Sequence, residues 1–140
     1  MIEKYSIKDG ICVHHTDNRA HLKISDFLKS NNLNKCLILC IGTDRFIGDS
    51  LGPLTGTLLS KLSLPVPILG TLDNPIHAVN LRKVMSHIKI SYKDHKIIAI
   101  DACLGASKSV GYVHVKEGSI QPGKGVGKRL SHVRDFSIIG

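Results

Sequence analysis

Two aspartates stand where acid–base chemistry could be done. Asp49 lies in a glycine-bearing segment, residues 42–53, that follows a continuous apolar run, and Asp101 directly follows a second such run. Two carboxyl groups that lie close together cannot both ionise easily, so they share a proton. One can then take a proton from water while the other donates one. The pair therefore predicts hydrolysis, and the structural alternative is a helix cap at Asp49 with loop hydrogen bonds at Asp101.

Asp44 and Arg45 lie in the same segment as Asp49. A guanidinium at Arg45 would orient a substrate carbonyl or hold one carboxylate of the pair ionised, because it offers several donors and a fixed positive charge. Asp44 would equally pair with Arg45 and shape the turn. We therefore predict a supporting role for both side chains.

A Gly- and Lys-rich stretch, residues 117–131, predicts a long surface loop. The basic residues in and just beyond it are Lys124, Lys128, Arg129 and Arg134. The stretch is not a phosphate-binding P-loop, because Pro122 and Arg129 stand where that motif needs Gly and Ser or Thr. The cluster is either a solvated face or a patch that steers acidic segments, with Lys124 as a substrate-binding candidate.

The elements that must position these residues alternate between strands and helices. Continuous apolar runs predict buried strands, and helical spacing of apolar residues predicts helices. The strands are expected over 35–41, 66–69, 96–100 and 111–116, and the helices over 21–30, 50–62 and 76–88. The apolar residues 136–140 form either a terminal strand or the point where the chain is cut short.

This alternation predicts an α/β fold, a three-layer α/β/α sandwich with a largely parallel central sheet. Ligands of such sheets bind at the carboxyl ends of the strands, so the segments of Asp49 and Asp101 are expected to meet in one crevice. Asp49 or Ser50 is expected to cap the second helix. The inward residues expected on the third helix are Val79, Val84 and Ile88. The cysteines expected to be reduced, in or near the core, are Cys12, Cys36, Cys40 and Cys103.

The composition bounds the class of protein. The chain has 140 residues, a formal net charge of +8 and 42% hydrophobic residues, which predicts one folded domain over residues 1–140 and excludes disorder. No apolar run reaches the roughly 18–20 residues of a membrane span and no signal-peptide pattern opens the chain, so we expect a cytoplasmic protein without membrane contact. With aromatics at only 4% and no Trp, we expect no specific nucleic-acid binding.

Five motifs resemble those of a known family. They are residues 40–45 (CIGTDR), 48–53 (GDSLGP), 70–81 (GTLDNPIHAVNL), 100–105 (IDACLG) and 121–126 (QPGKGV). Through them the chain resembles the spore protease YyaC family of sporulation proteins and, more distantly, germination protease and the hydrogenase-maturation peptidases. The resemblance implies a phosphorylase/hydrolase-like fold and an aspartic-type peptidase of a sporulating cell or spore. Its implied substrate is a protein or peptide, with small acid-soluble spore proteins as candidates.

The resemblance places the catalytic pair at Asp49, which precedes Ser-Leu-Gly-Pro, and at Asp101, which lies in an Ile-Asp-Ala segment. Asn74 stands where relatives carry an acid, and the chain lacks the additional segments of germination protease. Relatives continue beyond the equivalent of residues 138–140, which implies a truncation at the C-terminus. The alternative function is a non-catalytic sporulation factor that binds a peptide or protein partner in the same crevice.

The resembled hydrogenase-maturation peptidases use two acids and a histidine around a metal ion, so a divalent metal is the rival explanation of the acids. Its ligands would be Asp49, Asp101 and either His77 or His114, and such oxygen and imidazole donors suit nickel or zinc. The sequence holds no HExxH motif or tight His/Cys cluster. We therefore predict no cofactor and retain His77 as a supporting or substrate-binding residue.

Overall fold

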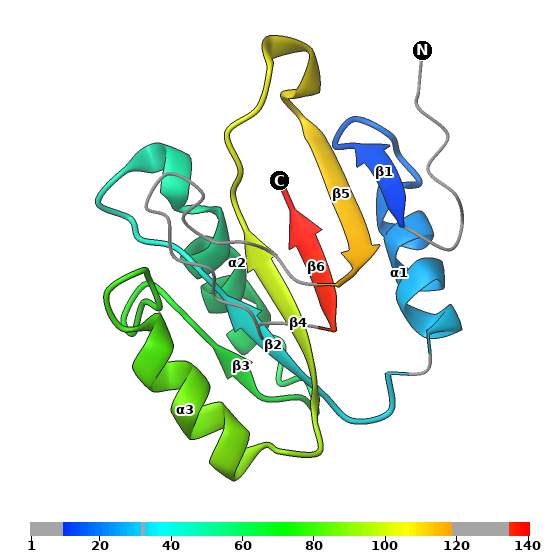
Figure 1. Ribbon diagram of the computed structural model, residues 1–140. Helices are drawn as coiled ribbons and strands as arrows, with labels where there is room; N and C mark the ends of the chain where they lie inside the picture. Colours follow the sequence, from blue (N-terminus) through cyan, green and yellow to red (C-terminus); the bar gives the residue numbers. More distant parts are fainter. Residues whose placement is uncertain (1–9, 32, 119–134) are drawn as a thin grey trace.

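The computed structural model describes residues 10–31, 33–118 and 135–140. In this part of the chain six strands form one sheet, in the order β1-β5-β6-β4-β2-β3, flanked by three α-helices (Figure 1). The strands are β1 (Ile11–His14), β2 (Cys36–Cys40), β3 (Ile68–Leu69), β4 (Lys96–Asp101), β5 (Tyr112–Glu117) and β6 (Phe136–Ile139). The helices are α1 (Ala20–Ser30), α2 (Leu51–Ser60) and α3 (Leu81–Ser91), with short 3-10 helices η1 (Ile47–Asp49) and η2 (Ser107–Ser109).

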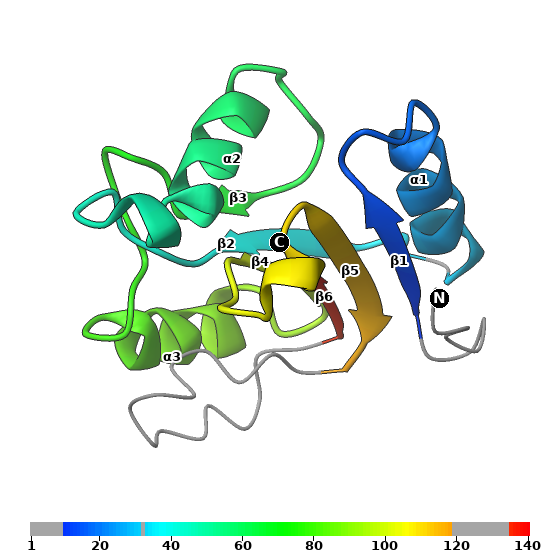
Figure 2. The same ribbon diagram turned by 90° about the horizontal axis from the view of Figure 1, so that it is seen from above.

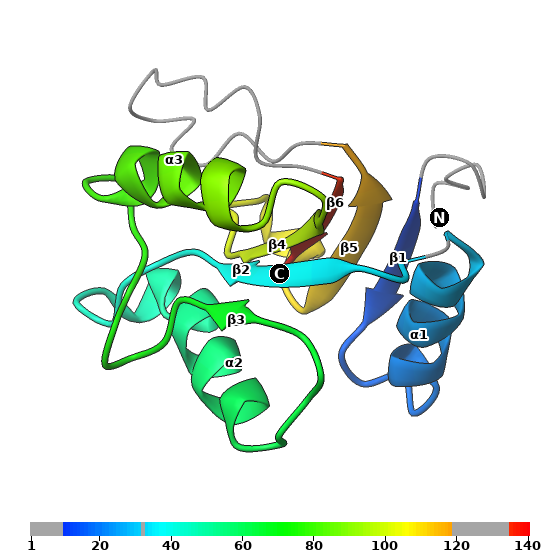
Figure 3. The same cartoon turned by 90° about the horizontal axis from the view of Figure 1, so that it is seen from below.

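The sheet is largely parallel. The neighbours β3, β2, β4 and β6 pair in parallel, and β5 is antiparallel to both of its neighbours, β6 and β1. Helix α3 covers one face, whereas α1 and α2 lie on the other (Figures 2 and 3). The predicted α/β sandwich is therefore confirmed.

Each face of the sheet is covered by an apolar layer. On one face Leu81, Met85 and Ile88 of α3 pack in a cluster with the buried Leu37 and Leu39 of β2. On the other face Phe27 of α1 and Phe136 of β6 belong to a second cluster, with ring centroids 6.3 Å apart. Burying one such side chain contributes about 1.5–3 kcal/mol, so these layers hold the helices against the sheet.

The third helix begins later than predicted. The sequence predicted it over 76–88, but α3 runs from Leu81 to Ser91. The side-chain amide of Asn80 donates to the carbonyl of Pro75 at 2.9 Å, and its side-chain oxygen accepts from the amide of His77 at 2.8 Å. These bonds hold residues 75–80 in a turn. Val79, expected to point inward, is therefore 89% exposed, which corrects that prediction, whereas Ile88 is buried and Val84 packs against the core as expected.

The last residues of the chain form β6, an inner strand between β4 and β5. Phe136–Ile139 is thus a strand, as one of the two interpretations of residues 136–140 expects. The loop predicted from 117 starts later, because Glu117 still belongs to β5. Most of that predicted loop, with Lys124, lies outside the described residues.

The cysteines divide into two groups. Cys40 is buried, and Cys12 and Cys36 are partly buried, as expected. Cys103 is exposed, so its predicted place in or near the core is wrong. It lies beyond the end of β4, and its thiol donates to the carbonyl of Leu104.

Two glycines of α2 let this helix lie directly on the ends of β2 and β3. A Cβ added at Gly52 would lie 2.1 Å from the carbonyl oxygen of Ile41, and one at Gly56 would lie 1.8 Å from that of Gly70. Both distances are far inside van der Waals contact, so neither position has room for a side chain. This close packing sets the N-terminus of α2, and with it Asp49, at the carboxyl edge of the sheet.

Candidate functional site

The ends of β2 and β4 lie side by side at the carboxyl edge of the sheet. Just beyond β2, the amide of Ile41 donates to the carbonyl of Ile100 at 2.8 Å. The chain then turns at Gly42, whose φ of +145° and close approach to the carbonyl of Asp49 exclude a side chain. Thr43 donates its amide to that same carbonyl at 3.0 Å. The segment therefore folds back and returns Asp49 to the end of β2.

Asp49 closes η1, and Ser50 separates it from the first residue of α2. The predicted side-chain cap of α2 is not formed at Ser50, whose hydroxyl donates instead to the carbonyl of Ile47 at 2.7 Å. No residue in the described part of the chain donates a hydrogen bond to the carboxylate of Asp49, and the side chain is only partly buried. This carboxylate is thus available to a ligand.

Asp101 is the last residue of β4 and is only 7% exposed. Burial raises the pKa of its carboxyl group to about 7, the amide of Ala102 opposes that shift, and the negative charge of Asp49 adds to it. The two carboxyl groups therefore sense each other electrostatically across the carboxyl edge. The structure brings together the pair that the sequence singled out.

Asp44 and Arg45 are exposed on the loop between Gly42 and η1. The amide of Arg45 donates to the hydroxyl of Thr43 at 3.2 Å, which shapes the turn through the main chain. Between these two described side chains no ion pair is formed. Both charges therefore face solvent at the rim of the acid pair.

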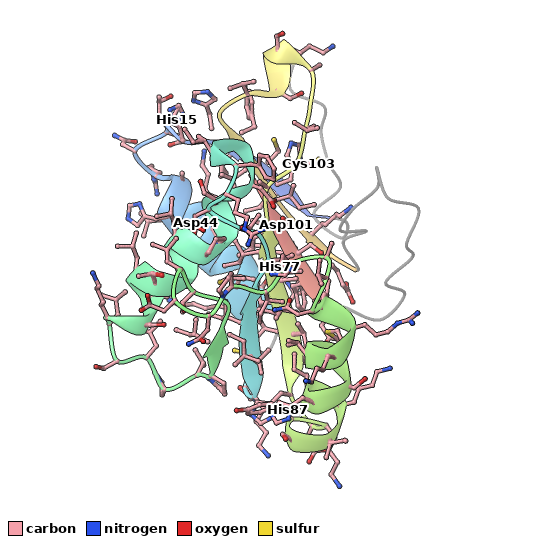
Figure 4. All side chains as sticks on the ribbon, turned by 90° about the vertical axis from the view of Figure 1, so that its left-hand side faces the viewer. His15, Asp44, His77, His87, Asp101 and Cys103 are labelled. Carbon is pink, nitrogen blue, oxygen red and sulfur yellow. The ribbon has the colours of Figure 1, made fainter. Side chains whose placement is uncertain are left out.

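His77 is tied to the same edge by the residue before it. Ile76 pairs with Ile41 in an isolated parallel bridge, and its carbonyl accepts from the amide of Gly42 at 2.7 Å. Figure 4 shows His77 at the same end of the sheet as Asp101, with His87 at the opposite end of α3. The Nδ1 atom of His77 accepts from the amide of Val79 at 3.3 Å.

His114 lies two strands away from Asp101. Asp101 is in register with Ile139, and Ile139 is in register with His114, so β6 separates the two side chains. His114 instead lies 3.7 Å from the thiol of Cys12. Among the described residues no three His, Cys, Asp or Glu side chains are grouped to hold a metal ion. The described donors therefore do not fit the divalent metal that the hydrogenase-maturation peptidases would imply.

Sequence reasoning missed a pocket beside this site. Lys83 and His87 line it together with His77, along the edge formed by β3 and α3. The available signal was the charge of the third helix, where basic residues have no acidic neighbours. That charge pattern alone does not indicate which face of the helix lines a pocket.

The fold and the site define a class: an open, largely parallel α/β sheet that carries two interacting aspartates at its carboxyl edge. The chain belongs to the family described as "Protein of unknown function (DUF1256)", whose model matches residues 12–140. It is 43% identical over 134 residues to "Uncharacterized protein YyaC" of Bacillus subtilis (strain 168). That alignment covers 91% of this chain and 65% of the relative, so the chain spans about two-thirds of the relative's length.

The predicted membership in the YyaC family is thereby confirmed, and the peptidase activity remains a prediction. The comparison with solved structures finds no match. None of the described helices is long and apolar enough to cross a membrane.

Proposed function

We propose that this protein hydrolyses peptide bonds with Asp49 and Asp101 as a proton-sharing pair. The observation that carries the proposal is the buried carboxyl group of Asp101, whose pKa is raised to about 7 by burial and by the charge of Asp49. Such a pair holds one proton between two carboxyl groups near neutral pH, which is the state that acid–base hydrolysis needs. The partly exposed Asp49 is the member of the pair that a substrate and its water can reach.

In the proposed reaction Asp49 accepts a proton from water as the water oxygen bonds to the peptide carbonyl carbon. Asp101 gives its proton to the carbonyl oxygen, which becomes a hydroxyl group of the tetrahedral intermediate. The C–N bond then breaks, the departing amine takes the proton from Asp49, and a hydroxyl proton returns to Asp101. Formation of the intermediate moves two protons and its breakdown moves two more, so the pair ends with Asp49 ionised and Asp101 protonated, as it began.

The residues around the pair would place the substrate. Arg45, exposed on the rim, would orient a substrate carbonyl through its guanidinium, and Asp44 would support the loop. His77 would donate from Nε2 to the substrate backbone. Lys124 stays a substrate-binding candidate from the sequence.

The cellular setting is proposed from the resemblance. A cytoplasmic role in a sporulating cell or spore, with small acid-soluble spore proteins as substrates, agrees with membership in the YyaC family. The printed name of the Bacillus subtilis relative assigns it no activity.

The test is cleavage of small acid-soluble spore proteins, read by mass spectrometry. The wild type is compared with Asp49→Asn and Asp101→Asn, and Asp26→Asn, an exposed aspartate of α1, is the matched control. Loss of cleavage in the first two variants and retention in the third supports the acid pair. Equal cleavage in all four proteins would overturn it.

Two other outcomes separate the alternatives. Cleavage that a chelator abolishes would return a divalent metal, with His77 as the histidine ligand, to the mechanism. Binding of the spore proteins without cleavage by the folded wild type would favour the non-catalytic partner-binding function.

A further inference from the structure

A pocket of about 750 Å³ runs between the edge of the sheet and α3. Among the strands that the structure describes, β3 is the outermost on this side and pairs with β2 alone (Figure 1). The residues that line the pocket and carry the argument are Ile68, Thr71, His77, Asn80, Lys83 and His87. The pocket thus combines a strand edge on one wall with a helix on the other.

Helix α3 turns two different faces to its surroundings. Leu81, Met85 and Ile88 are buried in the core. A neighbouring face of the same helix lines the pocket, and its residues recur at helical spacing: Asn80, Lys83, Val84 and His87. Lys83 and His87 are exposed there, so this face of the helix is polar and positively charged at Lys83.

The main chain of β3 offers hydrogen bonds toward the pocket. The amide of Ile38 in β2 donates to the carbonyl of Pro67 at 2.9 Å, and Ile38 is in register with Ile68. In a parallel ladder alternate residues bond to the same neighbour, so the N–H and C=O of Ile68 point away from β2. An extended chain laid beside Ile68 would therefore continue the sheet by one strand.

The positive charge of α3 favours an acidic partner. The basic residues of α3 are Arg82, Lys83 and Lys89, and no acidic residue lies among its 11 residues. The whole chain has a formal net charge of +8. Asp73 is the one acidic residue among those that line the described pocket, and it lies on the loop after β3 rather than on the helix. A peptide with acidic side chains is thus attracted to the helical wall.

We propose that an extended, acidic segment of a protein substrate binds in this pocket as an added strand beside β3. Its main chain pairs with Ile68, and its alternate side chains, those on the face of α3, meet Lys83 and His87. Ile76, whose backbone is bonded to Gly42, joins the pocket to the carboxyl edge where Asp49 lies. The docked segment therefore leads toward the acid pair, and in this respect the inference rests on the proposed function.

The test uses the full chain with Asp101→Asn, so that binding is measured without cleavage. The probe is a fluorescein-labelled decapeptide in which glutamate and valine alternate. The control is a labelled decapeptide of the same length in which lysine and valine alternate. We expect fluorescence anisotropy to show binding of the acidic peptide alone. Lys83→Glu should weaken that binding about tenfold, because an attraction to the peptide becomes a repulsion. Lys89→Glu makes the same charge change outside the pocket and should weaken binding by less than about twofold.

Amide hydrogen exchange tests the added strand itself. Saturating acidic peptide should slow exchange of the Ile68 amide at least about tenfold, because it gains a hydrogen-bond partner. The amide of Lys108, in η2 outside the pocket, should be unaffected. Equal losses in Lys83→Glu and Lys89→Glu, or unchanged exchange at Ile68 with peptide bound, would overturn the proposal.

The two proposals can fail separately. Pocket binding of the acidic peptide, without any cleavage of spore proteins by the wild type, would leave the docking site standing and refute the peptidase. Cleavage that depends on both aspartates, in a protein whose pocket does not bind the acidic peptide, would refute the docking site and leave the peptidase standing.

Discussion

Ile41 and Ile76 form a single parallel bridge just beyond the end of β2. Ile41 is also tied to β4, because its amide donates to the carbonyl of Ile100 at 2.8 Å. The turn that follows β3 is thereby held against the strands that carry the acid pair. This contact connects the candidate catalytic edge with the pocket along α3. Substitutions in the turn that follows β3 should therefore affect both the acid pair and the pocket.

Asp101→Asn should stabilise the folded protein at pH 8 and have little effect near pH 4. Burial raises the pKa of Asp101 to about 7, so the folded state binds this proton more tightly than the unfolded chain, where such a carboxyl group titrates near pH ~3.9. The free energy of unfolding of the wild type therefore falls as pH rises between these values, by on the order of 4 kcal/mol from this group.

Chemical denaturation of both proteins at pH 4, 6 and 8 checks this. Asp26→Asn, at an exposed site, should keep the pH dependence of the wild type. If Asp101→Asn kept it as well, the raised pKa would be refuted.

Hydrolysis should decline as pH rises above about 7. The proposed mechanism needs the proton on Asp101, whose pKa burial raises to about 7, and that proton is lost on the alkaline side. A plot of log kcat/KM against pH should bend downward near that value. A profile that stays flat to pH 9 would exclude Asp101 as the proton donor.

Gly56→Ala should destabilise the fold by about 2 kcal/mol. The new Cβ would lie 1.8 Å from the carbonyl oxygen of Gly70, a main-chain atom that cannot move away without disturbing β3. Overpacking of about 1–3 kcal/mol outweighs the helix propensity that Ala gains. Urea unfolding measures the effect. Gly48→Ala is the control, because no atom lies within 4 Å of its added Cβ, and it should change stability by less than about 0.5 kcal/mol.

The strands that carry the site were predictable because their signal is local. An uninterrupted apolar run ends before the segment of Asp49, and another ends at Asp101, so the sequence places both acids at strand ends. The meeting of those ends follows from a general property of parallel sheets.

The position of β6 was not predictable in this way. Asp101 is in register with Ile139, and such pairing depends on contacts between residues far apart in the chain. The late start of α3 depends on one side chain, that of Asn80, whose bonds override a run of residues with helical spacing. The pocket was missed because it depends on α3 lying beside β3, the outermost described strand on that side, and no local pattern predicts this neighbourhood.

Alkylation should modify Cys103 first and Cys40 last. Cys103 is exposed beyond the end of β4, whereas burial raises the pKa of the Cys40 thiol to about 12 and leaves almost no reactive thiolate. Iodoacetamide treatment of the native protein, followed by peptide mass mapping at successive times, gives the order. Early modification of Cys40 would contradict the packing of α2 against β2.

Asn80→Ala should destabilise the protein by about 2 kcal/mol and also weaken the site. It removes two hydrogen bonds: the one that the Asn80 amide donates to the carbonyl of Pro75, and the one that the Asn80 side-chain oxygen accepts from the amide of His77. Each partner is then left unsatisfied in a partly buried turn. Ile76 lies inside that turn, so its bridge to Ile41 should loosen. Thermal unfolding and acidic-peptide binding are the two measurements. The control is Asn74→Ala, which removes an exposed side chain of the same loop and should change the free energy of unfolding by less than about 0.5 kcal/mol. An equal loss of stability in both variants would show that the turn does not depend on Asn80.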